Sequence, residues 1–256
     1  MGLLSCQQLL IEVPGRTLVS GLDWDLEAGQ FWLILGRNGS GKTTLLQSLA
    51  GLRESQQGEI HLQQQSLQQY QRIEIAQRMA ILFQQQENGF PATVLESASA
   101  GRHPHRNFWG WPNEGDQEII HNALQQMDLL ALAHHSIDSL SGGERRRLEL
   151  ATLLVQDPAL FLLDEPTNHL DLHHQIDMLK HFHKLATEQR RCIVMASHEL
   201  NLGLRYCSHT LLLYGNGEWE AGKTDTLINA DRLEKLYQHP MQVHTTDQGN
   251  IYLPAQ

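Results

Sequence analysis

Short apolar runs alternate with stretches of helical periodicity along most of this chain. The run at residues 31–35 is apolar at every position, and similar short runs occur at 160–163, 192–196 and 210–214. Strands that are apolar on both faces are typical of a parallel sheet that helices cover on both sides. The pattern therefore predicts an α/β fold with a parallel central sheet.

The two ends of the chain have patterns of their own. Residues 9–13 and 18–26 indicate two strands joined by a turn that contains Gly15, and they precede the first buried run. Residues 3–6 are also expected to belong to a first strand. Near the other end, residues 242–245 and 251–253 flank a polar turn and indicate a hairpin. We therefore expect an N-terminal antiparallel β subdomain and a C-terminal hairpin.

Residues 88–157 interrupt the α/β pattern. Glycines and prolines divide this region, and residues 116–132 place Ile120, Leu124 and Met127 on one face of a helix. We therefore predict a helical insertion here. The expected organisation is one domain over 1–256, with an α/β core at 1–87 and 158–240, the helical insertion at 88–157 and the hairpin at 241–256.

Composition excludes some classes of protein. The chain has 256 residues, 41% of them apolar, and a net charge of −10, which argues against a protein that binds nucleic acid through its phosphates. Its three cysteines show no paired spacing and fit a reducing compartment. The apolar runs are far shorter than the ~20 residues that span a bilayer, so we expect neither a membrane span nor a targeting segment.

A glycine-rich loop lies between the first buried run and a helix predicted over residues 42–50. Its sequence fits the pattern G-x-x-x-x-G-K-[ST], in which backbone N–H groups surround a phosphate at the positive end of a helix. Lys42 is expected to reach the β- and γ-phosphates, and the Thr43 hydroxyl is expected to ligate Mg²⁺. The predicted nucleotide-binding residues of this loop are Gly36, Arg37, Asn38, Gly39, Ser40, Gly41, Lys42, Thr43 and Thr44.

A second anion site is predicted where Ser141, Gly142 and Gly143 open another helix. One chain does not need two such sites for one γ-phosphate, and a dimer that shares its ATP accounts for both. The arginines that follow, 145–147, spread around the helix, and we expect them to be solvated or to form salt bridges within the subunit.

Two carboxylates end the run at 160–163. Because side chains alternate along a strand, Asp164 and Glu165 point in different directions and should have different tasks. Asp164 is expected to bind Mg²⁺ through its water shell. Glu165 is expected to act as the general base that polarises the attacking water.

In this order, the motifs resemble those of the nucleotide-binding subunit of an ATP-binding cassette (ABC) transporter over essentially the whole chain. The resemblance implies that Gln84 contacts Mg²⁺ and couples to a membrane partner, with Gln85 or Gln86 as alternative matches. It also implies that Asp171 lies in a loop at a dimer interface and that His198 contacts the γ-phosphate. In this family, residues matching 141–143 bind the ATP of the opposite subunit, which gives a head-to-tail homodimer around two ATPs.

The resemblance has one departure. Relatives usually stack adenine on an aromatic residue near Val13, which offers apolar contact without an aromatic face. We therefore expect base selectivity to be loose. The expected cofactors are ATP and Mg²⁺.

Three kinds of ABC protein are alternatives for the function of this chain. Residues 101–105, 169–175 and 197–202 resemble importers of metal chelates such as an iron–siderophore complex, haem or cobalamin. The resemblance then implies two integral-membrane permease subunits, a periplasmic binding protein as an indirect partner, no nucleic acid, and a peripheral location on the cytoplasmic face of the bacterial inner membrane. The alternatives are the ATPase of an exporter and a soluble ATPase that acts on DNA or the ribosome.

Overall fold

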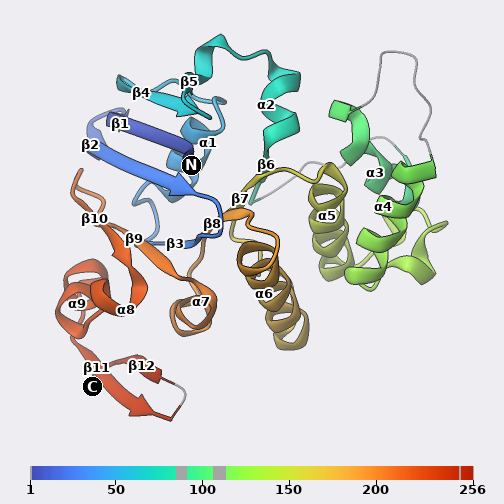
Figure 1. Ribbon diagram of the computed structural model, residues 1–256. Coiled ribbons are helices and arrows are strands. Elements are labelled where there is room, and N and C mark those ends of the chain that lie inside the picture. The colour runs from blue at the N-terminus through green and yellow to red at the C-terminus, as the bar shows by residue number, and fades with distance from the viewer. Residues whose placement is uncertain (1, 85–90, 106–113, 248, 256) are drawn as a thin grey trace.

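The computed structural model describes residues 2–84, 91–105, 114–247 and 249–255. Its largest sheet has six strands in the order β10-β9-β3-β8-β7-β6, and all neighbours are parallel except the edge pair β9–β10 (Figure 1). The prediction of a parallel central sheet is therefore confirmed, with one antiparallel edge strand added. The strands are β3 (Phe31–Leu35), β6 (Met79–Leu82), β7 (Leu160–Asp164), β8 (Cys192–Ala196), β9 (His209–Leu213) and β10 (Trp219–Lys223).

A four-stranded antiparallel sheet precedes this core, in the order β2-β1-β4-β5. Its strands are β1 (Gly2–Val13), β2 (Arg16–Glu27), β4 (Gln57–Leu62) and β5 (Gln65–Ser66). β1 includes both residues 3–6 and residues 9–13, and an irregularity at Gln8, whose φ is 49°, shifts the phase of its alternation between them. Cys6 and Leu9 are both buried although they lie three positions apart.

Helices cover the six-stranded sheet and form the region between β6 and β7. In Figure 1, α3, α4 and α5 lie together on one side of the molecule, away from the four-stranded sheet. The α-helices are α1 (Lys42–Leu49), α2 (Arg72–Arg78), α3 (Val94–Ser99), α4 (Glu114–Gln126), α5 (Gly142–Gln156), α6 (Leu172–Thr187), α7 (Leu200–Tyr206), α8 (Thr224–Leu227) and α9 (Ala230–Tyr237). Short 3-10 helices are η1 (Leu67–Gln69), η2 (Ala100–His105), η3 (Leu130–Leu132) and η4 (Ile137–Ser139).

The amphipathic helix expected over 116–132 is present but shorter. α4 ends at Gln126 because Asp128 takes the left-handed conformation, with φ at 52°, and the N–H of Leu129 donates to the carbonyl of Leu124. The predicted apolar face is buried. The last two strands, β11 (Met241–Thr246) and β12 (Gly249–Pro254), form the C-terminal hairpin.

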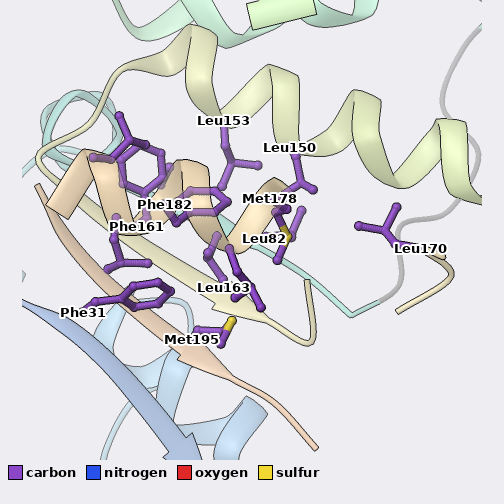
Figure 2. Close-up of a cluster of buried hydrophobic side chains, with 14 of the residues drawn as sticks. Phe31, Leu82, Leu150, Leu153, Phe161, Leu163, Leu170, Met178, Phe182 and Met195 are labelled. Atoms are coloured by element: carbon purple, nitrogen blue, oxygen red, sulfur yellow. The ribbon is translucent and has the colours of Figure 1, made fainter. Parts of the chain in front are cut away.

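The core alternates across the six-stranded sheet as the pleat requires. Phe31, Leu163 and Met195 face α5 and α6, where Figure 2 shows them beside Met178 and Phe182. The intervening positions of the same strands pack on the opposite face against α1 and the four-stranded sheet. The division of the chain into an α/β core, a helical insertion and a hairpin stays a prediction as far as its boundaries are concerned.

Candidate nucleotide site

An open pocket of about 750 Å³ lies beside the glycine loop, the ends of β7 and β8, and the turn between β1 and β2. It brings together residues that the sequence analysis predicted from five separate segments. The predicted residues that line it are Val13, Asn38, Gly39, Ser40, Gly41, Lys42, Thr43, Thr44, Gln84, Glu165 and His198. Gln85 and Gln86 lie outside the described residues.

The glycine loop is closely packed at Gly36. A Cβ at Gly36 would lie 2.3 Å from the Ser40 hydroxyl, so a side chain does not fit there. Gly41 has φ at 106° and directly precedes α1, and no side chain caps that helix. The first N–H groups of α1 are therefore free of a side-chain cap at the pocket, as an anion site at a helix N-terminus requires.

Lys42 is the cation of this loop. Its side chain folds back over the loop, and its Nζ donates to the carbonyl of Gly36 at 2.9 Å. The residue is only 6% exposed, and burial lowers the pKa of Lys42, while the nearby carboxylates of Glu165 and Asp164 oppose this shift. A second hydrogen bond, of 3.4 Å, joins Nζ to the carbonyl of Arg37, so the third donor of the ammonium group remains for a phosphate.

Asp164 meets the requirements for a magnesium ligand. It is 2% exposed, and its Oδ1 has no hydrogen-bond partner within the described part of the chain. Burial raises the pKa of Asp164, and a hydrogen bond from Thr43 opposes that shift. A buried carboxylate oxygen beside a hydroxyl is a donor set that suits Mg²⁺. The residues present therefore fit the ion.

Glu165 is held by three side chains from three different segments. Its Oε2 accepts hydrogen bonds from Gln84 Nε2 at 3.0 Å and Asn168 Nδ2 at 2.5 Å, and its Oε1 lies 2.6 Å from His198 Nε2. Its φ of 49° is unusual for a residue with a side chain, and such strain is common at functional sites. The strand end thus presents one carboxylate to the pocket and fixes its direction.

Asn168 was not singled out from the sequence, although it lies in the segment that contains Asp171. The only sequence signal was its position three residues after Glu165, which lets the two side chains meet across a tight turn.

Arg146 takes the second of the two roles expected for residues 145–147, a salt bridge within the subunit, and it is buried. It is 4% exposed rather than solvated, and its guanidinium donates to the carbonyls of Phe83, Asp164 and Glu165 at 2.8 Å each. It also forms the predicted kind of intrasubunit salt bridge, with Glu149 at 2.6 Å. Arg146 therefore ties α5 to the strand end that carries the two carboxylates.

Ser141, Gly142 and Gly143 lie apart from the residues that line this pocket. Ser141 caps α5, and it shares a reciprocal capping box with Glu144. A Cβ at Gly142 would meet nothing within 4 Å. On the side of Gly142 this helix N-terminus is therefore open to a molecule that approaches from outside the chain, whereas a Cβ at Gly143 would lie 3.1 Å from the carbonyl oxygen of His169.

Asp171 also lies outside the pocket, at the N-terminus of α6. Its carboxylate accepts from the backbone N–H of His174 at 3.0 Å and contacts the ring Nδ1 of the same residue at 2.9 Å. These contacts hold the pKa of Asp171 below its usual range. The structure thus separates the predicted residues into a pocket group and an exposed group formed by 141–143 and Asp171.

Val13 lies on the pocket wall with Leu18 and Arg16. Arg16 is fixed by two hydrogen bonds, from Nε and Nη2 to the carbonyl of Gly215, at 2.9 and 2.7 Å. The wall expected to contact the base therefore has an apolar and a guanidinium component, and the guanidinium was not predicted from the sequence.

Comparison with known proteins identifies the family. Residues 19–168 match the profile described as ABC transporter, which covers more than half of the chain. The chain belongs to the ABC transporter family. As an ABC protein of this kind, it is an ATPase whose hydrolysis of ATP is coupled to transport.

Related ABC proteins match over most of their length. The ferric enterobactin transport ATP-binding protein FepC of Escherichia coli K12 is 35% identical, with 90% of this chain and 85% of that protein covered. The hemin import ATP-binding protein HmuV of E. coli O157:H7 is 33% identical, with 92% of each covered. Among solved structures, an inward-facing putative metal-chelate type ABC transporter matches with a TM-score of 0.85 and 29% identity, covering 100% of this chain and 98% of that one.

Within the described ranges, no helix of this ABC protein combines the length and the apolar character needed to cross a membrane.

Proposed function

We propose that this chain is the ATP-hydrolysing subunit of an importer for a metal chelate, namely an iron–siderophore complex, haem or cobalamin. The observation that carries the proposal is full-length similarity: the match to a metal-chelate type transporter extends over the whole chain, including the helical region and the terminal hairpin. Relatives named for ferric enterobactin and hemin import add support for an iron chelate. The exporter alternative has no comparable support among these relatives.

In this proposal the pocket group performs hydrolysis. Lys42 and the N–H groups of the loop bind the β- and γ-phosphates, and Glu165 accepts a proton from the attacking water. Thr43, Asp164 and Gln84 would hold Mg²⁺, which neutralises charge on the phosphates when it is bound. Gln84 suits this task because its Nε2 donates to Glu165 and its Oε1 remains as an oxygen ligand.

His198 is assigned to the γ-phosphate. Its contact with Glu165 places its ring at the phosphate end of the pocket, beside the carboxylate that activates water. The imidazole can donate a hydrogen bond to a phosphate oxygen once that oxygen takes the place of the carboxylate.

In a dimer, the exposed group of one copy would complete the nucleotide site of the other copy. Ser141, Gly142 and Gly143 present an open helix N-terminus, and Asp171 lies at the start of α6. A head-to-tail homodimer would bring the helix N-terminus of one copy to the γ-phosphate bound by Lys42 of the other, with two ATPs buried between the copies. Hydrolysis should then depend on dimer formation.

The remaining partners follow from the same proposal. Two permease subunits would cross the inner membrane and bind this chain on the cytoplasmic face, and a periplasmic binding protein would deliver the chelate. The net charge of −10 supports the absence of nucleic acid among the partners.

The test is uptake in the host cell. A strain lacking this gene should fail to accumulate one labelled chelate among an iron–siderophore complex, haem and cobalamin. The wild-type gene should restore uptake, and a gene encoding Glu165→Gln should not. Normal uptake of all three chelates in the deletion strain would refute the proposal, and intracellular accumulation of a compound would support an exporter.

A further inference from the structure

The C-terminal hairpin contacts the helix that follows His198. Asn201, in the first turn of α7, uses its side-chain amide as both donor and acceptor toward one residue of β12. Its Nδ2 donates to the carbonyl of Tyr252 at 2.9 Å, and the N–H of Tyr252 donates to its Oδ1 at 2.9 Å. The asparagine amide thus takes the place of a neighbouring strand at the edge of the hairpin.

The hairpin that receives this contact is itself anchored. Tyr252 is 6% exposed, its hydroxyl donates to the carbonyl of Ile228 at 3.1 Å, and its ring belongs to the main hydrophobic cluster. Ahead of the hairpin, Gln238 accepts a hydrogen bond from Arg37 of the glycine loop. The C-terminal segment is therefore attached both to the phosphate-binding loop and to α7.

Other contacts pack Leu200 and Leu202 against the main hydrophobic cluster and fix the body of α7. Gly203 packs so closely on β3 that a Cβ there would lie 2.8 Å from the side chain of Leu33. At the far end of α7, His183 Nδ1 contacts the carbonyl of Tyr206 at 2.8 Å. The contact between Asn201 and Tyr252 acts on the turn next to His198.

A second cavity borders the first turn of α7. It has a volume of about 580 Å³, and His198, Leu200, Asn201 and Tyr252 are among the residues that line it. Open space therefore lies beside the segment that carries His198. The backbone of this segment passes directly into α7, because the N–H of Leu200 donates to the carbonyl of His198 at 3.0 Å.

We propose that Asn201 and the backbone of Tyr252 position His198 for hydrolysis, so that the C-terminal hairpin contributes to the ATPase activity. The inference rests on the proposed role of His198. Asn201 is a positioning residue, since it acts through His198. Displacement of a catalytic group by about 1 Å can cost up to ~100-fold in rate, so loss of this contact should lower kcat and spare ATP binding by the glycine loop.

The test is a double-mutant cycle on the full-length protein, measured as phosphate release. Asn201→Leu removes both hydrogen bonds and should lower kcat about tenfold, with KM for ATP changed by less than about twofold. In a His198→Ala background, the same substitution should change kcat by less than about twofold, because nothing is left to position. Asn201→Asp keeps the acceptor for Tyr252 and should have a smaller effect, about threefold.

Asn229→Ala is the matched control. The side chain of Asn229 caps α9, because its Oδ1 accepts from the N–H of Arg232 at 2.9 Å. The substitution removes this cap and leaves α7 unchanged. Its kcat should stay at the wild-type value. The inference is overturned if this control slows hydrolysis as much as Asn201→Leu, or if Asn201→Leu slows the His198→Ala background tenfold. If His198→Ala alone hydrolyses ATP normally, the proposed role of His198 fails instead.

Discussion

Replacement of Arg146 by methionine tests whether the strand end that carries Asp164 and Glu165 is held by one buried guanidinium. Methionine has a similar length and no charge, so the substitution removes three hydrogen bonds of 2.8 Å to backbone carbonyls and leaves Glu149 without its partner. Breaking a buried ion pair by removing one partner costs about 3–5 kcal/mol. For a chain of this size, ~1 kcal/mol shifts Tm by roughly 2–4 °C, so Tm should fall by about 10 °C.

The assay combines denaturant unfolding with ATP turnover. The free energy of unfolding of Arg146→Met should decrease by about 4 kcal/mol. Its kcat should fall as well, because two of the three carbonyls that lose their hydrogen-bond donor belong to Asp164 and Glu165. Nucleotide affinity should change little, since Lys42 and the glycine loop are not touched.

Arg147→Met is the control. Arg147 lies on the same helix, donates to the carbonyls of Met127 and Asp128 at 3.1 Å and contacts the exposed carboxylate of Asp128 at 3.3 Å. Its loss leaves no carboxylate buried without a partner, so it should cost only about 1–2 kcal/mol. The reasoning about a buried anchor would be refuted if both variants lost the same stability, or if Arg146→Met lost less than about 1 kcal/mol.

Other substitutions test the remaining site residues. Lys42→Ala should weaken ATP binding at least tenfold in a fluorescence titration, and unchanged affinity would exclude Lys42 from the phosphate site. Glu165→Gln should abolish hydrolysis and accumulate an ATP-bound dimer in size-exclusion chromatography, whereas normal turnover would remove Glu165 from the role of base. Because burial raises the pKa of Asp164, its ionised form destabilises the fold above the usual carboxyl pKa, and this cost disappears as the pH falls. Asp164→Asn should therefore raise Tm at pH 7 and abolish Mg²⁺-dependent turnover; a lower Tm would contradict the sign. GTP should support turnover within about tenfold of ATP, and Val13→Tyr should increase the preference for ATP through stacking; a GTP rate a hundredfold below that of ATP would contradict this.

Local sequence patterns were sufficient for the central sheet and the phosphate loop. β3 is buried on both faces, and its five residues are apolar at every position, so the pattern and the environment agree. The loop from Gly36 to Thr43 is specified by glycines that its close contacts require. In both cases the information lies within one short segment.

The residues that the sequence did not reveal act through tertiary contacts. Arg146 looks like any arginine on a helix surface, and only the packing of α5 against β7 shows that it is buried. Asn201 lies 51 positions from the residue that it contacts, so no local pattern could pair them.

The link between Arg16 and Gly215 has a thermodynamic consequence. The two residues lie 199 positions apart, and the guanidinium joins the start of β2 to the turn after β9. Fixing the backbone of one residue costs about 1–2 kcal/mol in conformational entropy, and here that cost is met during folding. The wall beside the nucleotide is thus ordered before ATP arrives, so less of the free energy of ATP binding is consumed in ordering the protein and more remains for conformational work.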